Sequence, residues 1–501
     1  MSTDIKSSDV TTALRSNTLG SLAASVRTPT YDRTSLTQGI VHIGVGNFHR
    51  AHEALVIDDL LNDDGSQPWA ICGVALLPSD EPTARKMQAQ DGLYTLVEKH
   101  ADGTWDTRII GSITEVLFAP DGIDAVLAKL CEPNIKIVSL TITEGGYNFD
   151  PITGDFMDQT PSIRNDLTSA APTTVFGVIT EALRRRREAG IAPFTVMSCD
   201  NIQHNGDVAK RSFVAFATLR DAELGDWVAA NVAFPNSMVD RITPMTTTDD
   251  VDKVLELIDA QDECPVVCEP FFQWVLEDDF PQGRPKFEKA RVQIVSDVAP
   301  YEKMKLRLLN ASHQGLAYFG YLQGYHYVHD AAQDENAALF LRRYMDEEAT
   351  PTLDPVPGVD LDAYKSELIE RFQNPEVKDT IARLCADPSD RIPKWLVPVI
   401  NDLLDQGRPV DMSAAIVASW ARYAEGVDES GQPIDVVDPL KFELTPLARS
   451  QRTNPTAFIE NTTLFGDLAG NPAFREPYVA TLQHLHEHGA RDTHAWLLAD
   501  H

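Results

Sequence analysis

The chain has 501 residues, of which 43% are hydrophobic, as is usual for a soluble globular protein with room for two or three domains. It carries 43 basic and 75 acidic residues, a formal net charge of −32. Such an acidic protein repels phosphate backbones and anionic lipids, so we expect no binding to nucleic acid or to a membrane surface.

Membrane and export signals are not found in the sequence. No apolar run reaches the roughly 18 residues of a membrane span, and the polar stretch from Met1 to Gly20 lacks the apolar core of a signal peptide. The six cysteines are sparse and unpatterned, which is typical of reduced thiols. Cys264 and Cys268 lie close together, but no other His or Cys stands at zinc spacing. We therefore expect a cytoplasmic protein that needs no metal.

The first part of the chain, up to about residue 290, alternates short β-rich runs with helical patterns, which is typical of a parallel α/β sheet. The polar turn Ala101 to Thr104 predicts a hairpin between its flanking strands, and Gly190 ends an amphipathic helix predicted over 173–188. The predicted strands are 39–43, 70–77, 94–98, 107–110, 135–141 and 194–198.

After about Ala299, helical periodicity replaces the strand pattern, with a Pro- and Asp-rich loop at 350–357. The predicted helices are 303–323, 332–348, 360–372, 393–405, 412–424 and 473–488. The predicted fold class is therefore α/β. We expect an N-terminal domain with a mostly parallel sheet over residues 1–295, followed by a mainly α-helical C-terminal domain over residues 296–501.

A glycine turn, Gly44-Val45-Gly46, follows the first predicted strand and precedes a helical run at 51–61. In this strand–turn–helix context, backbone N–H groups bind the pyrophosphate of a dinucleotide. Gly44 permits the tight turn, Gly46 permits close approach of the backbone, and His49 stands where a third glycine is usual. A turn without a ligand is the alternative, which the context disfavours. The residues predicted to line this cofactor site are Ile43, Gly44, Val45, Gly46, Asn47, Phe48, His49 and Arg50, the last supplying local positive charge.

The choice between NAD and NADP depends on the residues after the second predicted strand. Pro78-Ser79-Asp80-Glu81 offers carboxylates there, which accept hydrogen bonds from ribose hydroxyls and repel a 2′-phosphate. No basic residue follows until Arg85. The sequence therefore favours NAD, with Asp80 as the predicted contact.

A nine-residue stretch, Lys305 to His313, opens the helical part of the chain with an amine, a carboxamide and an imidazole. At the spacing of an α-helix, Asn310 falls roughly 140° and His313 roughly 80° from Lys305. The three side chains then share less than half of the helix circumference and can converge on one small ligand. An amine that accepts a proton, beside neutral hydrogen-bond donors, suits removal of a proton from an alcohol. Its place at the start of the second domain predicts a site at the interdomain cleft.

With both motifs in hand, the chain resembles the polyol-specific long-chain dehydrogenase/reductase family over nearly its whole length. The resemblance implies a Rossmann-type N-terminal domain, a helical C-terminal domain, NAD as cofactor, no metal and a monomer. The missing third glycine also fits this family. The segments that carry the resemblance are IVHIGVGNFHRAH from Ile40, TITEGGY from Thr141, SCDN ending at Asn201, KLRLLNASH from Lys305 and SDRIPKW from Ser389.

The resemblance also implies roles for individual residues. Lys305 matches the general base of the family, and Asn201 and Asn310 match its two oxyanion-binding amides. His313 matches the residue that binds and orients the substrate hydroxyl, and Glu302 matches a carboxylate that gates proton exit. Further matches are Glu144 at the cofactor, and Asp240 and Arg383 at the substrate hydroxyls.

The reaction implied is the NAD-dependent oxidation of D-mannitol to D-fructose, and its reversal. A free lysine, with a pKa of ~10.4, is too protonated to act as a base, so we expect burial or the charged nicotinamide ring to lower it. Lysine and two amides then replace a Lewis-acid metal. A hexuronate reductase of the same family is the alternative, but its substrate needs a cationic clamp that we do not find in the sequence. A non-catalytic NAD-binding sensor would have no use for the Lys–Asn–Asn–His set.

Overall fold

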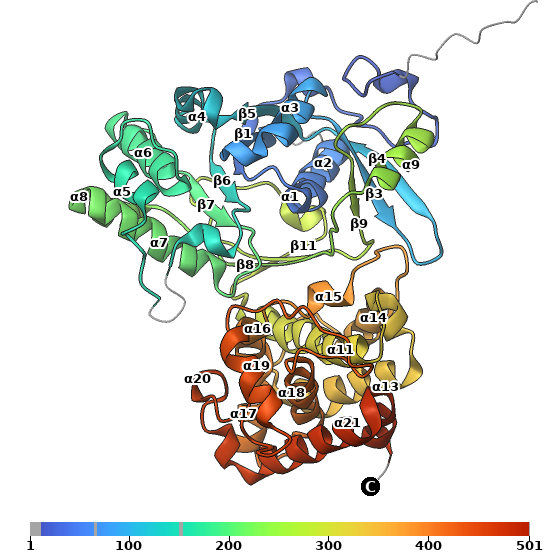
Figure 1. The fold of residues 1–501 in the computed structure, drawn as a ribbon. Coiled ribbons are helices and arrows are strands. Elements are labelled where there is room, and N and C mark those ends of the chain that lie inside the picture. Colours follow the sequence, from blue (N-terminus) through green and yellow to red (C-terminus); the bar gives the residue numbers. More distant parts are fainter. Residues whose placement is uncertain (1–11, 65–67, 150–153, 500–501) are drawn as a thin grey trace, which may run out of the picture. The chain divides into compact units, whose positions relative to one another are not determined.

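The computed structural model describes residues 12–64, 68–149 and 154–499, and the chain forms two units, Met1–Val298 and Ala299–His501 (Figure 1). The sequence predicts a division between residues 295 and 296. Most of the predicted polar N-terminal stretch, residues 1–11, lies outside the described residues.

The first unit is built on a five-stranded sheet in the order β5-β2-β1-β6-β7. All four neighbouring pairs are parallel, as the sequence predicts. Its strands are β1 (Gln38–Ile43), β2 (Ala70–Ala75), β5 (Ile113–Phe118), β6 (Ile137–Leu140) and β7 (Thr195–Ser198).

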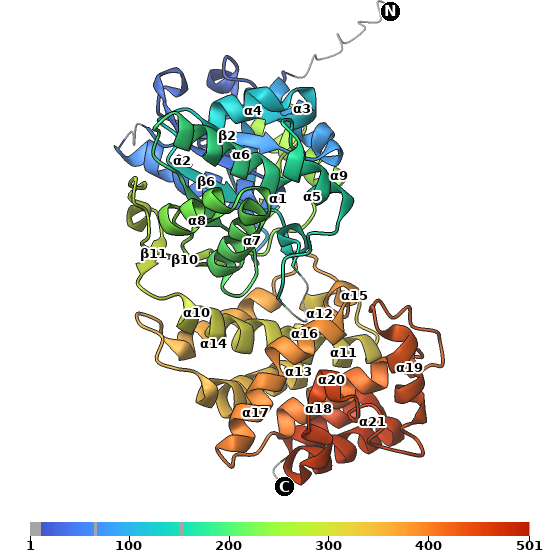
Figure 2. The same cartoon turned by 90° about the vertical axis from the view of Figure 1, so that its left-hand side faces the viewer.

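Helices cover both faces of this sheet (Figures 1 and 2), which explains why β1, β2, β6 and β7 are buried almost throughout, without alternation. On β1, Ile40 packs into a core cluster with Leu55 of α2, whereas Val41 packs into a second cluster with Leu127 of α4 and Ile179 of α6. The helices of this unit are α1 (Asn47–Ala51), α2 (Glu53–Asp64), α3 (Glu81–Ala89), α4 (Ile123–Leu130), α5 (Pro161–Thr168), α6 (Val175–Glu188), α7 (Asn205–Arg220), α8 (Ala222–Asn231) and α9 (Thr248–Ile258).

Two three-stranded sheets complete the first unit, in the orders β4-β3-β9 and β11-β10-β8. The predicted hairpin is present, since β3 and β4 pair antiparallel. The other four strands of these sheets were not predicted, because three to five residues show too little pattern. The six residues of β5 in the large sheet were not predicted either, since Thr114 and Glu115 interrupt its apolar run. The strands are β3 (Tyr94–Lys99), β4 (Trp105–Ile110), β8 (Ser237–Asp240), β9 (Val266–Cys268), β10 (Gln273–Glu277) and β11 (Val292–Val295).

The second unit is helical, as predicted. Helix α18 lies at its centre, with every residue from Met412 to Tyr423 buried, and packs against α11 and α21. The α-helices are α10 (Ala299–Met304), α11 (Ala311–Leu322), α12 (Val328–Ala332), α13 (Glu335–Arg343), α14 (Leu361–Phe372), α15 (Ile381–Leu384), α16 (Pro388–Trp395), α17 (Val397–Asp405), α18 (Asp411–Tyr423), α19 (Lys441–Ser450), α20 (Thr462–Phe465) and α21 (Pro472–Leu498).

Two predicted helices of this unit contain π-helical turns, which differ from the expectation. The predicted helix 303–323 is α10, then the π-helix η7 (Lys305–Asn310), then α11. The predicted helix 332–348 is α13 followed by a second π-helix, η8 (Tyr344–Ala349). Hydrophobic periodicity does not reveal such turns, because one inserted residue leaves the pattern on either side intact.

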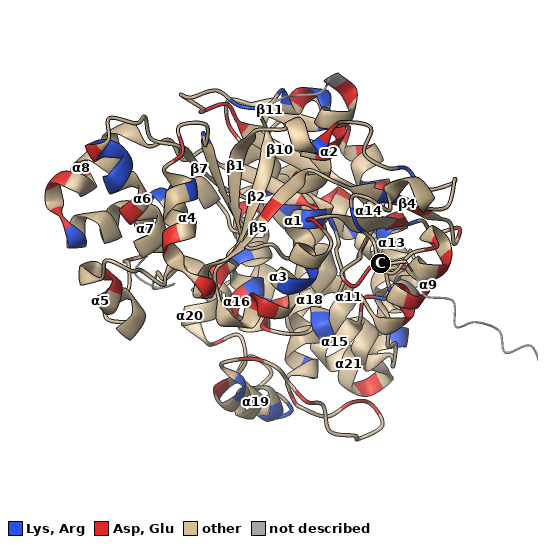
Figure 3. Cartoon of the chain, turned by 90° about the horizontal axis from the view of Figure 1, so that it is seen from above, with Lys and Arg blue, Asp and Glu red and all other residues tan. Residues whose placement is uncertain are grey.

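Charged residues of both signs lie along the outer helices, as Figure 3 shows for α3 and α8. Ion pairs such as Arg85 with Asp121, 2.6 Å apart, join opposite charges at the surface. Among the described residues, no helix combines the length and apolarity needed to cross a membrane. All six cysteines are free, and five of them are buried.

Candidate active site

The turn after β1 contains two glycines with different reasons for being there. Gly44 has φ of +104°, and a Cβ added to it would lie 2.2 Å from the carbonyl oxygen of Thr141. The backbone and the neighbouring strand therefore both require glycine at this position. A Cβ added to Gly46 would meet nothing within 4 Å. The packing of the protein leaves this space open, as the close approach of a ligand requires.

The helix after the turn begins earlier than predicted and is interrupted. Helix α1 starts at Asn47, with Gly46 as its N-cap, and ends at Ala51; its C-cap, His52, has φ of −126° and ψ of −93°. The chain then continues as α2, whereas the sequence predicts one helix over 51–61. The first N–H groups of a helix lack partners within it, so the turn offers main-chain donors beside the open space at Gly46.

The side chains of His49 and Arg50 turn into the protein. Arg50 is buried, and its guanidinium donates to the carbonyl oxygen of Cys264 at 2.5 Å and to Oδ1 of Asn47 at 2.7 Å. It also lies over the ring of Tyr94. The charge of Arg50 is thus directed at oxygen atoms of the protein itself, and the positive charge predicted for the cofactor is bound internally.

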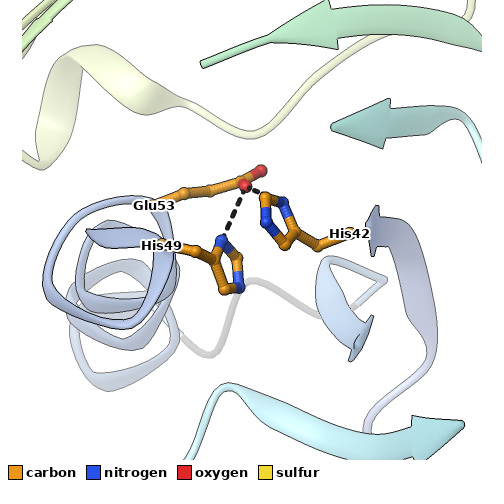
Figure 4. Close-up of side chains that lie close together, drawn as sticks. All are labelled: His42, His49 and Glu53. Atoms are coloured by element: carbon orange, nitrogen blue, oxygen red, sulfur yellow. Dashed lines mark ion pairs between the residues drawn. The ribbon is translucent and has the colours of Figure 1, made fainter. Parts of the chain in front are cut away.

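A buried polar cluster of His42, His49 and Glu53 lies next to the turn (Figure 4). Glu53 Oε2 lies 3.0 Å from Nδ1 of His42 and 3.2 Å from Nδ1 of His49. Burial alone would raise the pKa of Glu53, but the two imidazoles outweigh it and hold that pKa below its usual range. Burial, aided by the neighbouring His42, lowers the pKa of His49 to about 3. His49 is therefore neutral at physiological pH.

His42 links this cluster to the turn. Its Nε2 lies 3.0 Å from the carbonyl oxygen of Gly44 and 2.9 Å from Oγ1 of Thr141. The hydroxyl of Thr141 in turn donates to the same carbonyl at 2.7 Å. The carbonyl of Gly44 is thereby fixed by side chains of two neighbouring strands, and the cluster braces the turn.

The same three side chains lie near enough to one another to be considered as metal ligands, with their ligand atoms within 4.8 Å. Imidazole binds a metal along a lone pair in the plane of its ring, and the ligands of one ion must converge on it. The rings of His42 and His49 are stacked 3.3 Å apart and only 10° from parallel. Their lone pairs run side by side, so the arrangement favours a brace over a shared metal site.

Asp80 and Glu144 follow the two strands that flank β1. Asp80 ends the short helix η3 (Pro78–Asp80) after β2, and its Oδ2 accepts a hydrogen bond from the N–H of Leu77 at 2.9 Å. Glu144 begins η5 (Glu144–Tyr147) after β6 and is exposed. Because β2, β1 and β6 are parallel, their carboxyl ends share one edge of the sheet with the glycine turn. Both carboxylates therefore lie at the edge where dinucleotides bind in such sheets.

Asn201 follows β7 at the same edge and is exposed. The residue before it, Asp200, is buried and accepts hydrogen bonds from the N–H groups of Ile142 at 3.1 Å and Thr143 at 2.8 Å. Burial raises the pKa of Asp200, although these hydrogen bonds act against it. Asp200 thus ties the end of β7 to the end of β6 and fixes the backbone that carries Asn201.

In the second unit, Lys305 and Asn310 are the first and last residues of the π-helix η7. The N–H of Ala311 bonds to the carbonyl of Leu306, five residues back. The predicted angles of roughly 140° and 80° assume α-helical spacing and are therefore wrong for this segment. Lys305 and Asn310 are each 6% exposed. Single π-turns within α-helices are frequent at functional sites.

Glu302 and His313 lie on either side of η7. Glu302 belongs to α10 and is buried. His313 belongs to α11, is partly exposed, and has its ring 4.6 Å from that of Phe372. With Lys305 and Asn310, these residues form one continuous helical run of the second unit, as the sequence predicts.

The two predicted substrate contacts, Asp240 and Arg383, differ in exposure. Asp240 ends β8 of the first unit and is buried. The side chain of Arg383 in α15 is 58% exposed and pairs with Asp379, whose Oδ1 lies 2.5 Å from its Nε. Hydrogen bonding to Asp379 raises the pKa of Arg383. Because this charge already faces a carboxylate, Arg383 is a poor clamp for a substrate carboxylate.

Sequence reasoning missed two groups that shape the site. Asp200 stands directly before Asn201, and its position at the end of a predicted strand could have indicated a role at the site. Tyr344 donates its hydroxyl to the carbonyl oxygen of Arg307 in η7 at 3.0 Å. The two residues are 37 positions apart, and no local pattern connects them.

Comparison with known proteins finds similarity in both units. Residues 38–289 match the mannitol dehydrogenase Rossmann domain, and residues 297–486 match the mannitol dehydrogenase C-terminal domain. Mannitol 2-dehydrogenase of Aspergillus fumigatus is 45% identical over 465 residues, which cover 91% of this chain and 92% of that protein.

Two solved structures resemble the whole chain. The ternary complex of Pseudomonas fluorescens mannitol 2-dehydrogenase with NAD and D-mannitol is 44% identical, with a TM-score of 0.85 over 97% of this chain and 99% of that chain. A substrate-free D-sorbitol dehydrogenase is 37% identical, with a TM-score of 0.90 over 96% of this chain and 99% of that chain.

Proposed function

Because the chain belongs to the mannitol dehydrogenase family, we propose that it catalyses the NAD-dependent oxidation of D-mannitol to D-fructose and the reverse reduction. The observation that carries this proposal is the 44% identity, over 97% of the chain, to the Pseudomonas fluorescens enzyme whose structure contains NAD and D-mannitol. The fold predicted from the sequence, a Rossmann-type domain followed by a helical one, is confirmed by the same family match.

The glycine turn is the proposed binding site for the pyrophosphate of NAD. Apart from Gly46 and its two neighbours in the chain, no protein atom lies within 4 Å of the position that a Cβ of Gly46 would occupy. The absence of a side chain therefore leaves room for the pyrophosphate at the backbone. We assign the contacts to main-chain atoms of the segment from Ile43 to His49, since the side chains of His49 and Arg50 are directed into the protein. The fixed carbonyl of Gly44 keeps these donors in one arrangement before the cofactor binds.

The ribose contact is assigned to Asp80, with Glu144 beside the cofactor at the same sheet edge. A carboxylate accepts hydrogen bonds from ribose hydroxyls and repels a 2′-phosphate, which favours NAD over NADP. Bound NAD supplies the acceptor for the hydride that leaves the carbinol carbon.

Lys305 is the proposed base that takes the hydroxyl proton of the substrate. Its burial, at 6% exposed, limits the access of water to the proton transfer. Asn310 and Asn201 donate amide hydrogens to the developing alkoxide and stay neutral beside the lysine. His313 orients the hydroxyl, and Glu302 passes the proton outward from Lys305.

The remaining substrate hydroxyls are assigned to Asp240 and Arg383. A carboxylate accepts a hydrogen bond from a hydroxyl and a guanidinium donates one to a hydroxyl, so each residue can contact a polyol. Asp379 accepts hydrogen bonds from Nε and Nη2 of Arg383 and matches its charge. A neutral polyol therefore suits this residue better than a hexuronate does.

The proposed reaction needs no metal, because the base and the two amide donors supply what a Lewis acid would. Dialysis of the enzyme against a chelator should leave the rate of D-mannitol oxidation unchanged. Loss of activity that returns on adding Zn²⁺ would contradict this part of the proposal.

Substrate assays test the proposal directly. NADH formation from NAD is followed with D-mannitol, D-sorbitol and D-arabinitol, and NADH consumption with two hexuronates, fructuronate and tagaturonate, each over a range of concentrations. We expect D-mannitol to have the highest kcat/KM, with at least tenfold slower turnover when NADP replaces NAD. Turnover of hexuronates without turnover of D-mannitol would overturn the proposal.

D-sorbitol is the second candidate substrate, because the D-sorbitol dehydrogenase structure matches with a TM-score of 0.90. The stereochemistry of the reverse reaction separates the two. Reduction of D-fructose with NADH creates a new carbinol centre, and chromatography identifies the product as D-mannitol or D-sorbitol. We expect D-mannitol. If D-sorbitol were the main product, D-sorbitol would replace D-mannitol as the first candidate substrate.

We also propose that the enzyme is a monomer and lies in the cytoplasm. The family resemblance favours a monomer, and the six free cysteines suit a reducing compartment. Light scattering during size-exclusion chromatography should give a mass near 55.3 kDa. Twice that mass would exclude the monomer.

A further inference from the structure

The π-helix η7 lacks one of the hydrogen bonds that an α-helix would have. In an α-helix, the N–H of Ala311 would bond to the carbonyl of Arg307, four residues back. Here that N–H bonds to Leu306, five residues back. The carbonyl of Arg307 therefore loses its usual donor, in the middle of the segment that runs from Lys305 to Asn310.

Tyr344 supplies a donor to this carbonyl from another helix. Its hydroxyl donates to the carbonyl oxygen of Arg307 at 3.0 Å, and its side chain is fully buried. Burial raises the pKa of Tyr344 well above its usual value, so the hydroxyl keeps its proton. Because a buried carbonyl without a partner is unfavourable, this hydrogen bond favours the π-turn over the α-helical alternative.

Both partners of this hydrogen bond are themselves fixed. The guanidinium of Arg307 donates to the carbonyl oxygen of Thr352 at 3.1 Å and to Asp402 at 2.6 Å. Tyr344 begins η8, whose Glu348 accepts hydrogen bonds from the N–H groups of Met412 and Ser413 at the start of α18, at 2.7 and 2.8 Å. The hydroxyl is thus held against the wide turn by the packed interior of the second unit.

We propose that Tyr344 is a positioning residue, whose hydrogen bond to the carbonyl of Arg307 holds the π-turn that sets Lys305 relative to Asn310 and His313. If the turn relaxed to α-helical spacing, the residues before it would shift by one position, which rotates them by roughly 100° about the helix axis. Lys305 would then no longer face the same ligand as Asn310 and His313. This inference rests on the proposed function, in which these three residues act on one substrate.

Tyr344→Phe tests the proposal, because it removes the hydroxyl and keeps the ring. Tyr318→Phe is the matched control: Tyr318 is fully buried in α11, and its hydroxyl donates to the side chain of Gln314 at 2.6 Å, not to the backbone. We expect Tyr344→Phe to lower kcat for D-mannitol by at least tenfold with NAD affinity within twofold, and to change the pH dependence of kcat. Tyr318→Phe should keep kcat within twofold.

A rescue separates positioning from packing. Replacing Tyr344 with 4-aminophenylalanine restores a donor at the same place, and we expect kcat to return to within threefold of the natural enzyme. Equal loss of activity in both phenylalanine variants, or no rescue by the amine, would overturn the proposal.

Hydrogen exchange gives a readout that does not depend on turnover. Amides of residues 305–312 should exchange at least tenfold faster in Tyr344→Phe than in the natural protein, and should be unchanged in Tyr318→Phe. Unchanged exchange in both variants would overturn the proposal even if no polyol were a substrate. Should Tyr344→Phe fail to fold, the exchange of these amides in the 4-aminophenylalanine protein provides the comparison, with natural rates expected.

Discussion

The glycine turn of the first unit and the π-helix η7 of the second both carry residues of the proposed site, but they are stabilised in different ways. Gly44 is required by its own backbone angle and by the carbonyl of Thr141 on the neighbouring strand. The π-turn depends on the hydroxyl of Tyr344, from 37 positions further along the chain. The turn is thus fixed by local geometry, whereas the π-helix is fixed by tertiary structure. Substitutions in the two regions should therefore affect stability and activity in different ways.

Lys305→Ala should have the largest effect on activity. Loss of the base should lower kcat for D-mannitol by at least about a thousandfold, because general-base catalysis alone contributes up to ~10⁴. NAD affinity, measured by fluorescence quenching, should stay within twofold. Lys303→Ala is the control, since Lys303 is only two residues away and its amine pairs with Asp354 at 2.9 Å; its kcat should stay within twofold. A kcat of Lys305→Ala within tenfold of the natural enzyme would remove Lys305 from the role of base.

The two glycines of the turn should separate folding from binding. Gly44→Ala places a Cβ 2.2 Å from a carbonyl oxygen at a positive φ, and we expect it to destabilise the first unit by about 3 kcal/mol or more. Gly46→Ala meets no atom of the protein and should cost less than about 1 kcal/mol. Hydrogen exchange of the amides of β1 and β6 measures both values within the first unit.

Gly46→Ala should nonetheless weaken NAD binding by about tenfold, since its methyl group would occupy the space that we assign to the pyrophosphate. Calorimetric titration with NAD measures this effect. An unchanged dissociation constant would mean that the pyrophosphate binds elsewhere. The proposed difference between Gly44, required for folding, and Gly46, required for binding, would then be wrong.

Local signals in the sequence explain why the glycine turn was predicted and the π-turn was not. A strand followed by Gly44 and Gly46 is a contiguous pattern, and the angle at Gly44 agrees with it. Nothing near Lys305 indicates that Ala311 bonds five residues back, because the donor that favours this register is Tyr344. The order of helices was therefore predictable, but the geometry within one of them was not.

Long-range contacts also limited what could be said of charges. The sequence places Arg50 beside the glycine turn, which suggests a phosphate contact. The structure shows its guanidinium donating to the carbonyl oxygen of Cys264, 214 positions away. The spacing in one run predicted Lys305, Asn310 and His313 as a set, and the family resemblance added Asn201. Neither could show that Asp200 fixes the backbone at Asn201.

Acid should weaken α1 and α2, which carry His49 and Glu53 of the brace and are joined at His52. The pKa of His49 is lowered to about 3 by burial and by His42, and burial lowers that of His52 to about 3. Since both lie below the unfolded value near 6.5, the stabilisation is complete above pH 6.5 and is lost as pH falls toward 3. Each imidazole should cost about 1.4 kcal/mol per pH unit in that range.

His49→Phe should therefore halve this pH dependence, because His52 still titrates. Hydrogen exchange of α1 and α2 at pH 4.5 to 7 measures local stability in a protein of two units, where a single unfolding transition is not expected. Equal pH slopes in His49→Phe and in the natural protein would show that His49 is already charged in the folded state.

A rise in pH from mildly acidic to neutral should weaken the anchor of η8, with a smaller effect. Burial raises the pKa of Glu348 to about 7, although its hydrogen bonds from Ser413 and Met412 act against this. Because the folded value exceeds the unfolded one, the native state binds the proton more tightly, and stability falls as pH rises from about 4.5 to about 7. The total loss should be on the order of 3 kcal/mol.

Glu348→Gln removes this titration and should match the natural protein near pH 5 but exchange more slowly at 344–349 above pH 8. Identical profiles would show that Glu348 is ionised throughout. The effect bears on catalysis, because Lys305 accepts protons best at high pH, where the anchor of Tyr344 is weakest. Above about pH 7, where Glu348 has lost its proton, the rate of D-mannitol oxidation should therefore be higher in Glu348→Gln than in the natural enzyme. This result would connect the geometry of the π-turn to a contact outside it.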